Sequence, residues 1–112
     1  MNLYCKVYLD APPPREAVLK SLAEWTGGAT HLRTITTGLF EADVVNNEDF
    51  DEARRHRSRD GFLFYRYYLD IEPQPGAPEA EYVGALRALL TRLRAEGWGG
   101  VASCAFEDRL AE

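Results

Sequence analysis

The sequence predicts an α+β domain in which a four-stranded antiparallel sheet carries two helices on one face, in the order βαββαβ. Three observations predict it. Apolar and polar residues alternate in several segments, apolar residues recur at helical spacing in two others, and prolines or glycines separate the segments. At 112 residues, the chain has the size of a single domain, residues 1–112.

The first strand is expected over residues 2–10, where apolar and polar residues alternate. Its inward-facing side chains are Leu3, Cys5, Val7 and Leu9. Pro12, Pro13 and Pro14 end this strand, because proline cannot donate to a sheet ladder. A helix is expected from Arg15 to about Thr26, with Gly27-Gly28 as its stop signal.

The second and third strands are expected over residues 31–46 and 61–72. Gly38 indicates a bend in the first of these, and residues 46–60 are expected to form a long connection. In the third strand, the predicted inner face is Leu63, Tyr65, Tyr67, Leu69 and Ile71. The predicted outer face is Phe62, Phe64, Arg66, Tyr68 and Asp70.

Pro78 is expected to open the second helix, and glycines at positions 97, 99 and 100 end it. The last strand is expected over residues 101–107, with Ala102, Cys104 and Phe106 directed inward. This element order is the ferredoxin-like, or split-βαβ, arrangement. Right-handed crossovers then place both helices on one face and leave the other face uncovered.

Composition and charge narrow the function classes. The net charge of −5 argues against a general nucleic-acid-binding protein, which normally has a basic excess. No apolar run is long enough to cross a bilayer, and the N-terminal residues lack the pattern of a signal peptide, so we expect a cytoplasmic protein. Cys5 and Cys104 are expected on neighbouring strands, either as buried thiols or as a cross-strand disulfide.

The uncovered sheet face is the first candidate site. It is expected to gather aromatic and basic side chains, namely Tyr4, Lys6, Tyr8, Phe62, Phe64, Arg66 and Tyr68. Such a surface suits a protein contact, including homodimerisation through the sheet, or a small ligand. Base stacking by a nucleic acid is a third reading, although the characteristic Lys/Arg-Gly-aromatic run is missing.

The second candidate site is an acidic segment that an arginine cluster follows. Its predicted partner-binding residues are Glu41, Asp43, Glu48, Asp49, Phe50, Asp51 and Glu52. The acids could steer a basic partner, with Phe50 as an apolar anchor. Alternatively, pairs such as Asp51 with Arg55 make the loop self-neutralising. A calcium site is a further alternative, although the EF-hand spacing is missing.

No catalytic residues can be assembled from the sequence. Neither a phosphate-binding glycine loop nor a Ser-His-acid set is present. The cysteines and histidines lack the paired spacing of zinc ligands, so no metal and no cofactor is expected. The sequence therefore favours a non-enzymatic binding protein.

Three segments, FEADVVNNEDFDEARR, GFLFYRYYLDIE and the C-terminal CAFEDRL, together with the size and acidity of the chain, resemble the compact immunity proteins of bacterial polymorphic toxin systems. The resemblance implies a toxin inhibitor that occludes a basic toxin domain in the cytoplasm of the producing cell. The alternative is a dimeric α+β module that binds a small ligand, or acts as a small enzyme, between two sheet faces.

Overall fold

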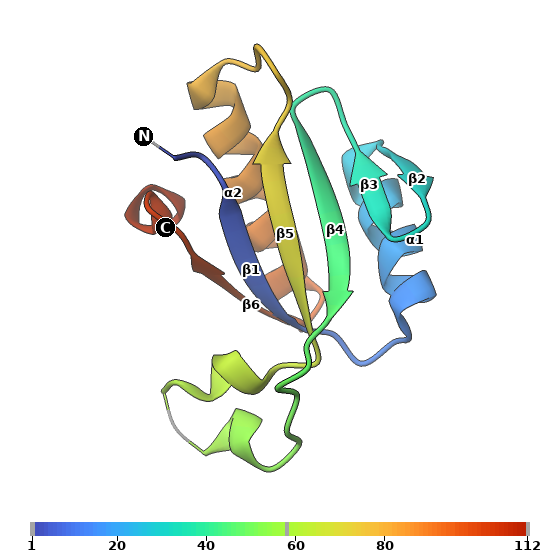
Figure 1. Cartoon of the computed structure of the whole chain (residues 1–112), viewed down its shortest axis with the longest axis vertical. Coiled ribbons are helices and arrows are strands. Elements are labelled where there is room, and N and C mark those ends of the chain that lie inside the picture. Colours follow the sequence, from blue (N-terminus) through green and yellow to red (C-terminus); the bar gives the residue numbers. More distant parts are fainter. Residues whose placement is uncertain (1, 58, 112) are drawn as a thin grey trace.

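A computed structural model describes residues 2–57 and 59–111 and contains two helices and an antiparallel sheet (Figure 1). The strands are β1 (Cys5–Asp10), β2 (Ala29–His31), β3 (Thr34–Thr36), β4 (Phe40–Asn46), β5 (Tyr67–Pro73) and β6 (Gly99–Ser103). The helices are α1 (Arg15–Thr26) and α2 (Glu79–Ala95), and the 3-10 turns are η1 (Arg54–His56), η2 (Gly61–Phe64) and η3 (Glu107–Leu110). The α+β class is confirmed.

The sheet is wider than expected. Within residues 2–57 and 59–111 it has six strands, not four, in the order β2-β3-β4-β5-β1-β6, and every neighbouring pair is antiparallel. The four strands that correspond to the predicted ones are adjacent as β4-β5-β1-β6. The two additional strands, β2 and β3, form a hairpin that extends the sheet beyond β4.

The single strand expected over residues 31–46 is wrong, because this segment contains both β3 and β4. The chain reverses direction at Gly38 and Leu39, so that β3 and β4 pair with each other. The Thr37 hydroxyl fixes the reversal, because it accepts hydrogen bonds from the backbone N–H groups of Leu39 (3.1 Å) and Phe40 (3.0 Å). A bend at Gly38 was expected, but a complete turn was not.

The strand expected over residues 61–72 is wrong in its first part, because Gly61–Phe64 forms a 3-10 turn and β5 begins only at Tyr67. Gly61 packs so closely against the Arg55 carbonyl that a Cβ atom there would lie 2.5 Å from the carbonyl oxygen. The Asn47 amide donates hydrogen bonds to the carbonyls of Leu63 (3.0 Å) and Tyr65 (2.8 Å), which therefore have partners outside a sheet ladder. Consequently Leu63 and Tyr65 are not buried, whereas the inward positions from Tyr67 onward are.

The last strand is shorter than predicted. It spans Gly99–Ser103, and the chain then turns into η3. Phe106 is still buried, as expected, but it reaches the core from the turn that follows the strand, and its ring centroid lies 6.1 Å from that of Tyr82. Ala102 and Cys104 pack at the margin of the core.

Both helices begin and end where the sequence indicated. Pro14 and Pro78 occupy the extended positions before α1 and α2. Gly27, with φ of 73°, and Gly97, with φ of 80°, adopt the left-handed conformation that stops a helix. Within residues 2–57 and 59–111, neither helix is long and apolar enough to cross a membrane.

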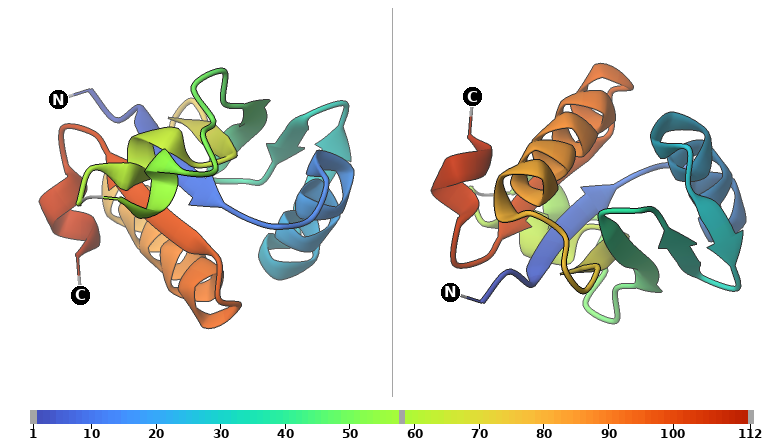
Figure 2. Two further views of the ribbon diagram at one scale, coloured as in Figure 1. Left: turned by 90° about the horizontal axis from the view of Figure 1, so that it is seen from below. Right: turned by 90° about the horizontal axis from the view of Figure 1, so that it is seen from above.

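The core lies between the helices and one face of the sheet. The views along the long axis show α1 and α2 on the same side of the strands (Figure 2). Alternate strand residues such as Val7, Val44 and Leu69 are buried against the helices, as are Leu22 of α1 and Leu86 of α2. The intervening strand residues face the opposite side, which neither α1 nor α2 covers.

Replacing Phe106 with alanine tests the position of the C-terminal turn. Phe106 is 1% exposed, so its removal leaves a cavity beside Tyr82, and we expect a loss of about 3–5 kcal/mol in the free energy of unfolding. The matched control is Leu63→Ala, because Leu63 is 40% exposed, and we expect a change of about 0.5 kcal/mol or less. Urea unfolding measures both; equal losses would show that Phe106 is not a core residue.

Candidate functional site

The sheet face opposite the helices, called the open face below, is the candidate site. Because strand side chains alternate, the residues between the buried positions point to this face. They are Lys6 and Tyr8 of β1, Glu41, Asp43 and Val45 of β4, and Tyr68, Asp70 and Glu72 of β5, with Tyr4 just before β1. The open face has an acidic end and an aromatic end.

Four carboxylates form the acidic end, called the acidic patch: Glu41, Asp43, Asp70 and Glu72. The pairing of β4 with β5 sets Glu41 directly opposite Glu72 and Asp43 directly opposite Asp70. Like charges at directly opposed positions destabilise a sheet. The patch borders a hollow of about 350 Å³.

The inner two carboxylates of the patch, Asp43 and Asp70, have local partners. The Thr34 hydroxyl donates a hydrogen bond to Asp43 (2.6 Å), and Arg33 lies 4.0 Å from the same carboxylate. The Tyr4 hydroxyl donates to Asp70. Burial, followed by the hydrogen bond and the negative charge of Asp70, raises the pKa of the Tyr4 phenol, so Tyr4 remains a neutral donor.

The outer two carboxylates, Glu41 and Glu72, are exposed. No hydrogen bond or ion pair joins either side chain to another described residue. They are therefore the members of the patch that are most available to a cationic partner.

Three rings and one ammonium group make up the aromatic end, called the aromatic cluster: Tyr8, Phe62, Tyr68 and Lys6. The Tyr8 and Phe62 rings meet edge-on, with their centroids 5.3 Å apart. The Tyr8 centroid lies 6.3 Å from the Tyr68 centroid. The Lys6 ammonium nitrogen lies 4.2 Å from the Tyr68 ring centroid and 4.9 Å from that of Tyr8. Cation–π attraction therefore holds the only lysine of the open face among its own rings.

The 47–66 loop folds against the end of the sheet where β1 and β4 finish and β5 begins (Figure 1). Arg55 pins it there through an ion pair and hydrogen bond with Asp10 at the end of β1. Phe62 adds an apolar contact with Tyr8. Over residues 47–57 and 59–66, the loop is therefore an extension of the open face.

The acids predicted as one binding element are divided between two places. Glu41 and Asp43 belong to the acidic patch, whereas the other four lie in the 47–66 loop. Asp51 accepts hydrogen bonds from the N–H groups of Ala53 and Arg54, each at 3.0 Å. Glu52 pairs with Arg55 and lies 3.7 Å from His56.

These contacts change the titration of the loop acids. The backbone N–H of Arg54 lowers the pKa of Asp51, and the Arg55 hydrogen bond lowers the pKa of Glu52. A carboxyl with a depressed folded pKa stabilises the folded state above its unfolded pKa. The contribution is therefore present at neutral pH and lost as the pH falls through the folded values.

Other predicted site residues are also dispersed. Glu48 and Asp49 are exposed on the loop, and the Arg66 guanidinium carbon lies 4.7 Å from the Phe50 ring centroid. The Arg54 guanidinium carbon likewise lies over the Phe64 ring, 5.4 Å from its centroid. Phe64 and Arg66, expected on the outer face of a strand, thus belong to the loop, because the chain between Gly61 and Phe64 is a 3-10 turn.

Asp70 and Glu72 were missing from the predicted binding set. The available signal was the pattern acid-x-acid in two strands, Glu41-x-Asp43 and Asp70-x-Glu72. Such a pattern places both acids of each strand on one face, but only the strand register shows that the two pairs meet.

The thiols and one of the two imidazoles lie outside the open face. Cys5 and Cys104 are free thiols, and burial followed by contact with Cys104 raises the pKa of Cys5, which makes it a poor nucleophile. His31 is exposed at the end of β2. Within residues 2–57 and 59–111, no group of three or more His, Cys, Asp or Glu side chains could hold a metal ion.

A scan against protein-family models and searches of curated proteins and of solved structures found no match to this chain. The chemistry of the open face therefore has to be deduced from its own residues.

Replacing Arg55 with alanine tests how the loop is held. The variant loses the contacts with Asp10 and Glu52, and we expect amide hydrogen exchange in residues 61–66 to accelerate about tenfold. Arg57→Ala is the matched control, because Arg57 is exposed and its side chain forms no ion pair with another residue of 2–57 or 59–111. Unchanged exchange in Arg55→Ala would contradict the pinning role.

Proposed function

We propose that this protein is a non-enzymatic binding protein whose open face receives a basic protein partner, and that it acts as an immunity protein against a cognate toxin in the cytoplasm. The observation that carries the proposal is the direct opposition of Glu41 with Glu72 and of Asp43 with Asp70. We further propose that its fold is a ferredoxin-like core, β4-β5-β1-β6, extended by the β2–β3 hairpin.

Opposed carboxylates suit a surface that a cationic partner covers. In the free protein, Glu41 and Glu72 repel each other across the strands, which lowers stability. A partner's arginine or lysine placed between them replaces that repulsion with two attractions. The patch also creates a negative field that steers a basic partner toward the sheet.

The rest of the open face supplies the apolar part of such an interface. Tyr8, Phe62 and Tyr68 present ring surface next to the acidic patch, and aromatic residues are enriched at the centres of interfaces. Glu48 and Asp49 extend the negative charge onto the exposed loop. A partner with a basic, partly apolar cleft would meet both ends of the face.

If a large toxin gene lies immediately upstream of this gene, the direct test measures association with the basic domain of its product. We expect the variant Glu41→Lys/Glu72→Lys to slow association about tenfold or more at low salt, and added salt to reduce the difference. The matched control is Glu24→Lys/Glu81→Lys, which changes the net charge equally on the helices. Stopped-flow fluorescence measures the rates.

Two results would contradict the proposal. One is an equal slowing by the control variant, which would attribute the effect to net charge alone. The other is failure of the unaltered protein to protect cells that produce a toxin domain whose gene lies immediately upstream.

The aromatic cluster favours a second candidate, a dimer that encloses a small ligand between two open faces. Tyr8 and Tyr68 are only half-buried in the single chain, so a second copy could cover them. Sedimentation equilibrium distinguishes the two. A dimer that Tyr68→Ser dissociates supports this candidate, and a strict monomer excludes it.

A further inference from the structure

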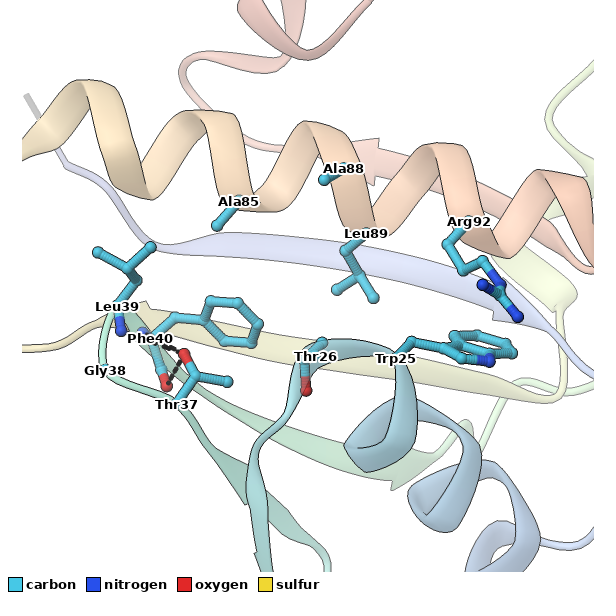
Figure 3. Close-up of a pocket in the computed structure, with 10 residues that line it drawn as sticks. All are labelled: Trp25, Thr26, Thr37, Gly38, Leu39, Phe40, Ala85, Ala88, Leu89 and Arg92. Atoms are coloured by element: carbon cyan, nitrogen blue, oxygen red, sulfur yellow. Dashed lines mark hydrogen bonds between the residues drawn. The ribbon is translucent and has the colours of Figure 1, made fainter.

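A groove on the helical side of the sheet lies between the C-terminal end of α1, the β3–β4 turn and α2 (Figure 3). Its volume is about 410 Å³, which falls in the range of small-molecule sites. Figure 3 shows the side chains of Trp25, Phe40 and Leu89 along its walls, with Arg92 at one end. The groove is on the opposite side of the sheet from the open face.

The two helices pack on different parts of the widened sheet. α1 packs on β2, β3 and β4, whereas α2 packs on β6 and on the C-terminal turn. The helices are therefore spread over a six-stranded sheet. Where α2 borders the opening it carries Ala85 and Ala88, whose small side chains leave the space unfilled.

The two threonine hydroxyls of the walls are already satisfied. The Thr26 hydroxyl donates to the Leu22 carbonyl (2.8 Å). The Thr37 hydroxyl accepts from the N–H groups of Leu39 and Phe40, as the dashed lines in Figure 3 show. Most of the groove therefore favours an apolar ligand body, because a polar one would lose water without gaining new partners.

Arg92 brings a charged group to one end of the groove. Its guanidinium carbon lies 4.9 Å from the Trp25 ring centroid, and its Nε donates to Glu96 (3.2 Å). Its two terminal nitrogens make no hydrogen bond to a residue of 2–57 or 59–111. They can accordingly form charge-assisted hydrogen bonds with an anion at the end of the groove.

We propose that this groove binds a medium-chain aliphatic carboxylate, with its alkyl chain along α2 and its carboxylate on Arg92. Ala85 and Arg92 are two helical turns apart, about 10 Å, so the site is elongated in the direction that a linear chain requires. The rings of Trp25 and Phe40 and the Leu89 side chain would remove the alkyl chain from water. This site is independent of the function proposed for the open face.

Titration with decanoate tests the proposal through intrinsic fluorescence. The chain has two tryptophans, and both report on the groove: Trp25 lines it, and Trp98 lies 5.1 Å from Trp25. We expect decanoate to produce a saturable change in emission at submillimolar concentration. No change up to its solubility limit would overturn the proposal.

Two substitutions separate the charged contact from the apolar one. Arg92→Gln should weaken decanoate binding about tenfold and leave decanol binding unchanged. Ala85→Leu fills the groove and should abolish the binding of both compounds. The proposed site would be overturned if Arg92→Gln weakened decanoate and decanol binding equally. It would also be overturned if Ala85→Leu still bound decanoate.

Controls keep each outcome interpretable. Ala80→Leu adds the same side chain at an exposed position of α2 and should leave binding unchanged. If circular dichroism shows that Ala85→Leu does not fold, Ala88→Leu provides the same test from the next turn. Glu72→Lys, on the open face, should not alter decanoate binding.

Discussion

The register between β4 and β5 is the constraint on which the rest of the structure depends. It pairs Ala42 with Ile71 and Val44 with Leu69, and all four side chains are buried beneath the helices. The same register brings Glu41 opposite Glu72 and Asp43 opposite Asp70 on the other face. A shift by one residue would exchange the two faces, so the register that builds the core is also the one that opposes the carboxylates.

The two faces of the sheet therefore have different roles. The helical face supplies stability through its apolar core, and the widened sheet leaves an apolar groove between α1 and α2. The open face gathers charge and aromatic surface that the chain itself does not cover. The 47–66 loop joins the open face through Arg55 and Phe62. Its arginines engage Asp51 and Glu52, whereas Glu48 and Asp49 remain exposed.

Local pattern was sufficient to predict β1 and both helices, but not the β2–β3 hairpin. The alternation in β1, the prolines before both helices and the glycines after them gave the α+β class and the one-sided helical cover. Alternation gave the wrong prediction at Phe62 and Phe64, where the sequence resembles a strand. The side-chain amide of Asn47 and the tight Arg55–Gly61 contact hold this segment in a 3-10 turn. Those contacts join residues distant in sequence, which periodicity does not detect.

The candidate site could be predicted only in part, for a related reason. Tyr4, Tyr8 and Tyr68 were placed correctly because strand alternation determines their face. The acidic patch required the register of two strands, and the groove required the spacing of two helices; neither is encoded in one segment. The six acids between Glu41 and Glu52 suggested a single negative element, whereas the arginines that follow engage Asp51 and Glu52.

A double-mutant cycle of Glu41→Gln and Glu72→Gln, followed by urea unfolding at low ionic strength, tests the central claim most directly. If the two carboxylates repel each other in the free protein, each single substitution relieves the same repulsion. The sum of the two stability gains should then exceed the gain of the double variant by about 0.2–1 kcal/mol. Additive effects would contradict the account, because they would mean that the opposed charges do not interact.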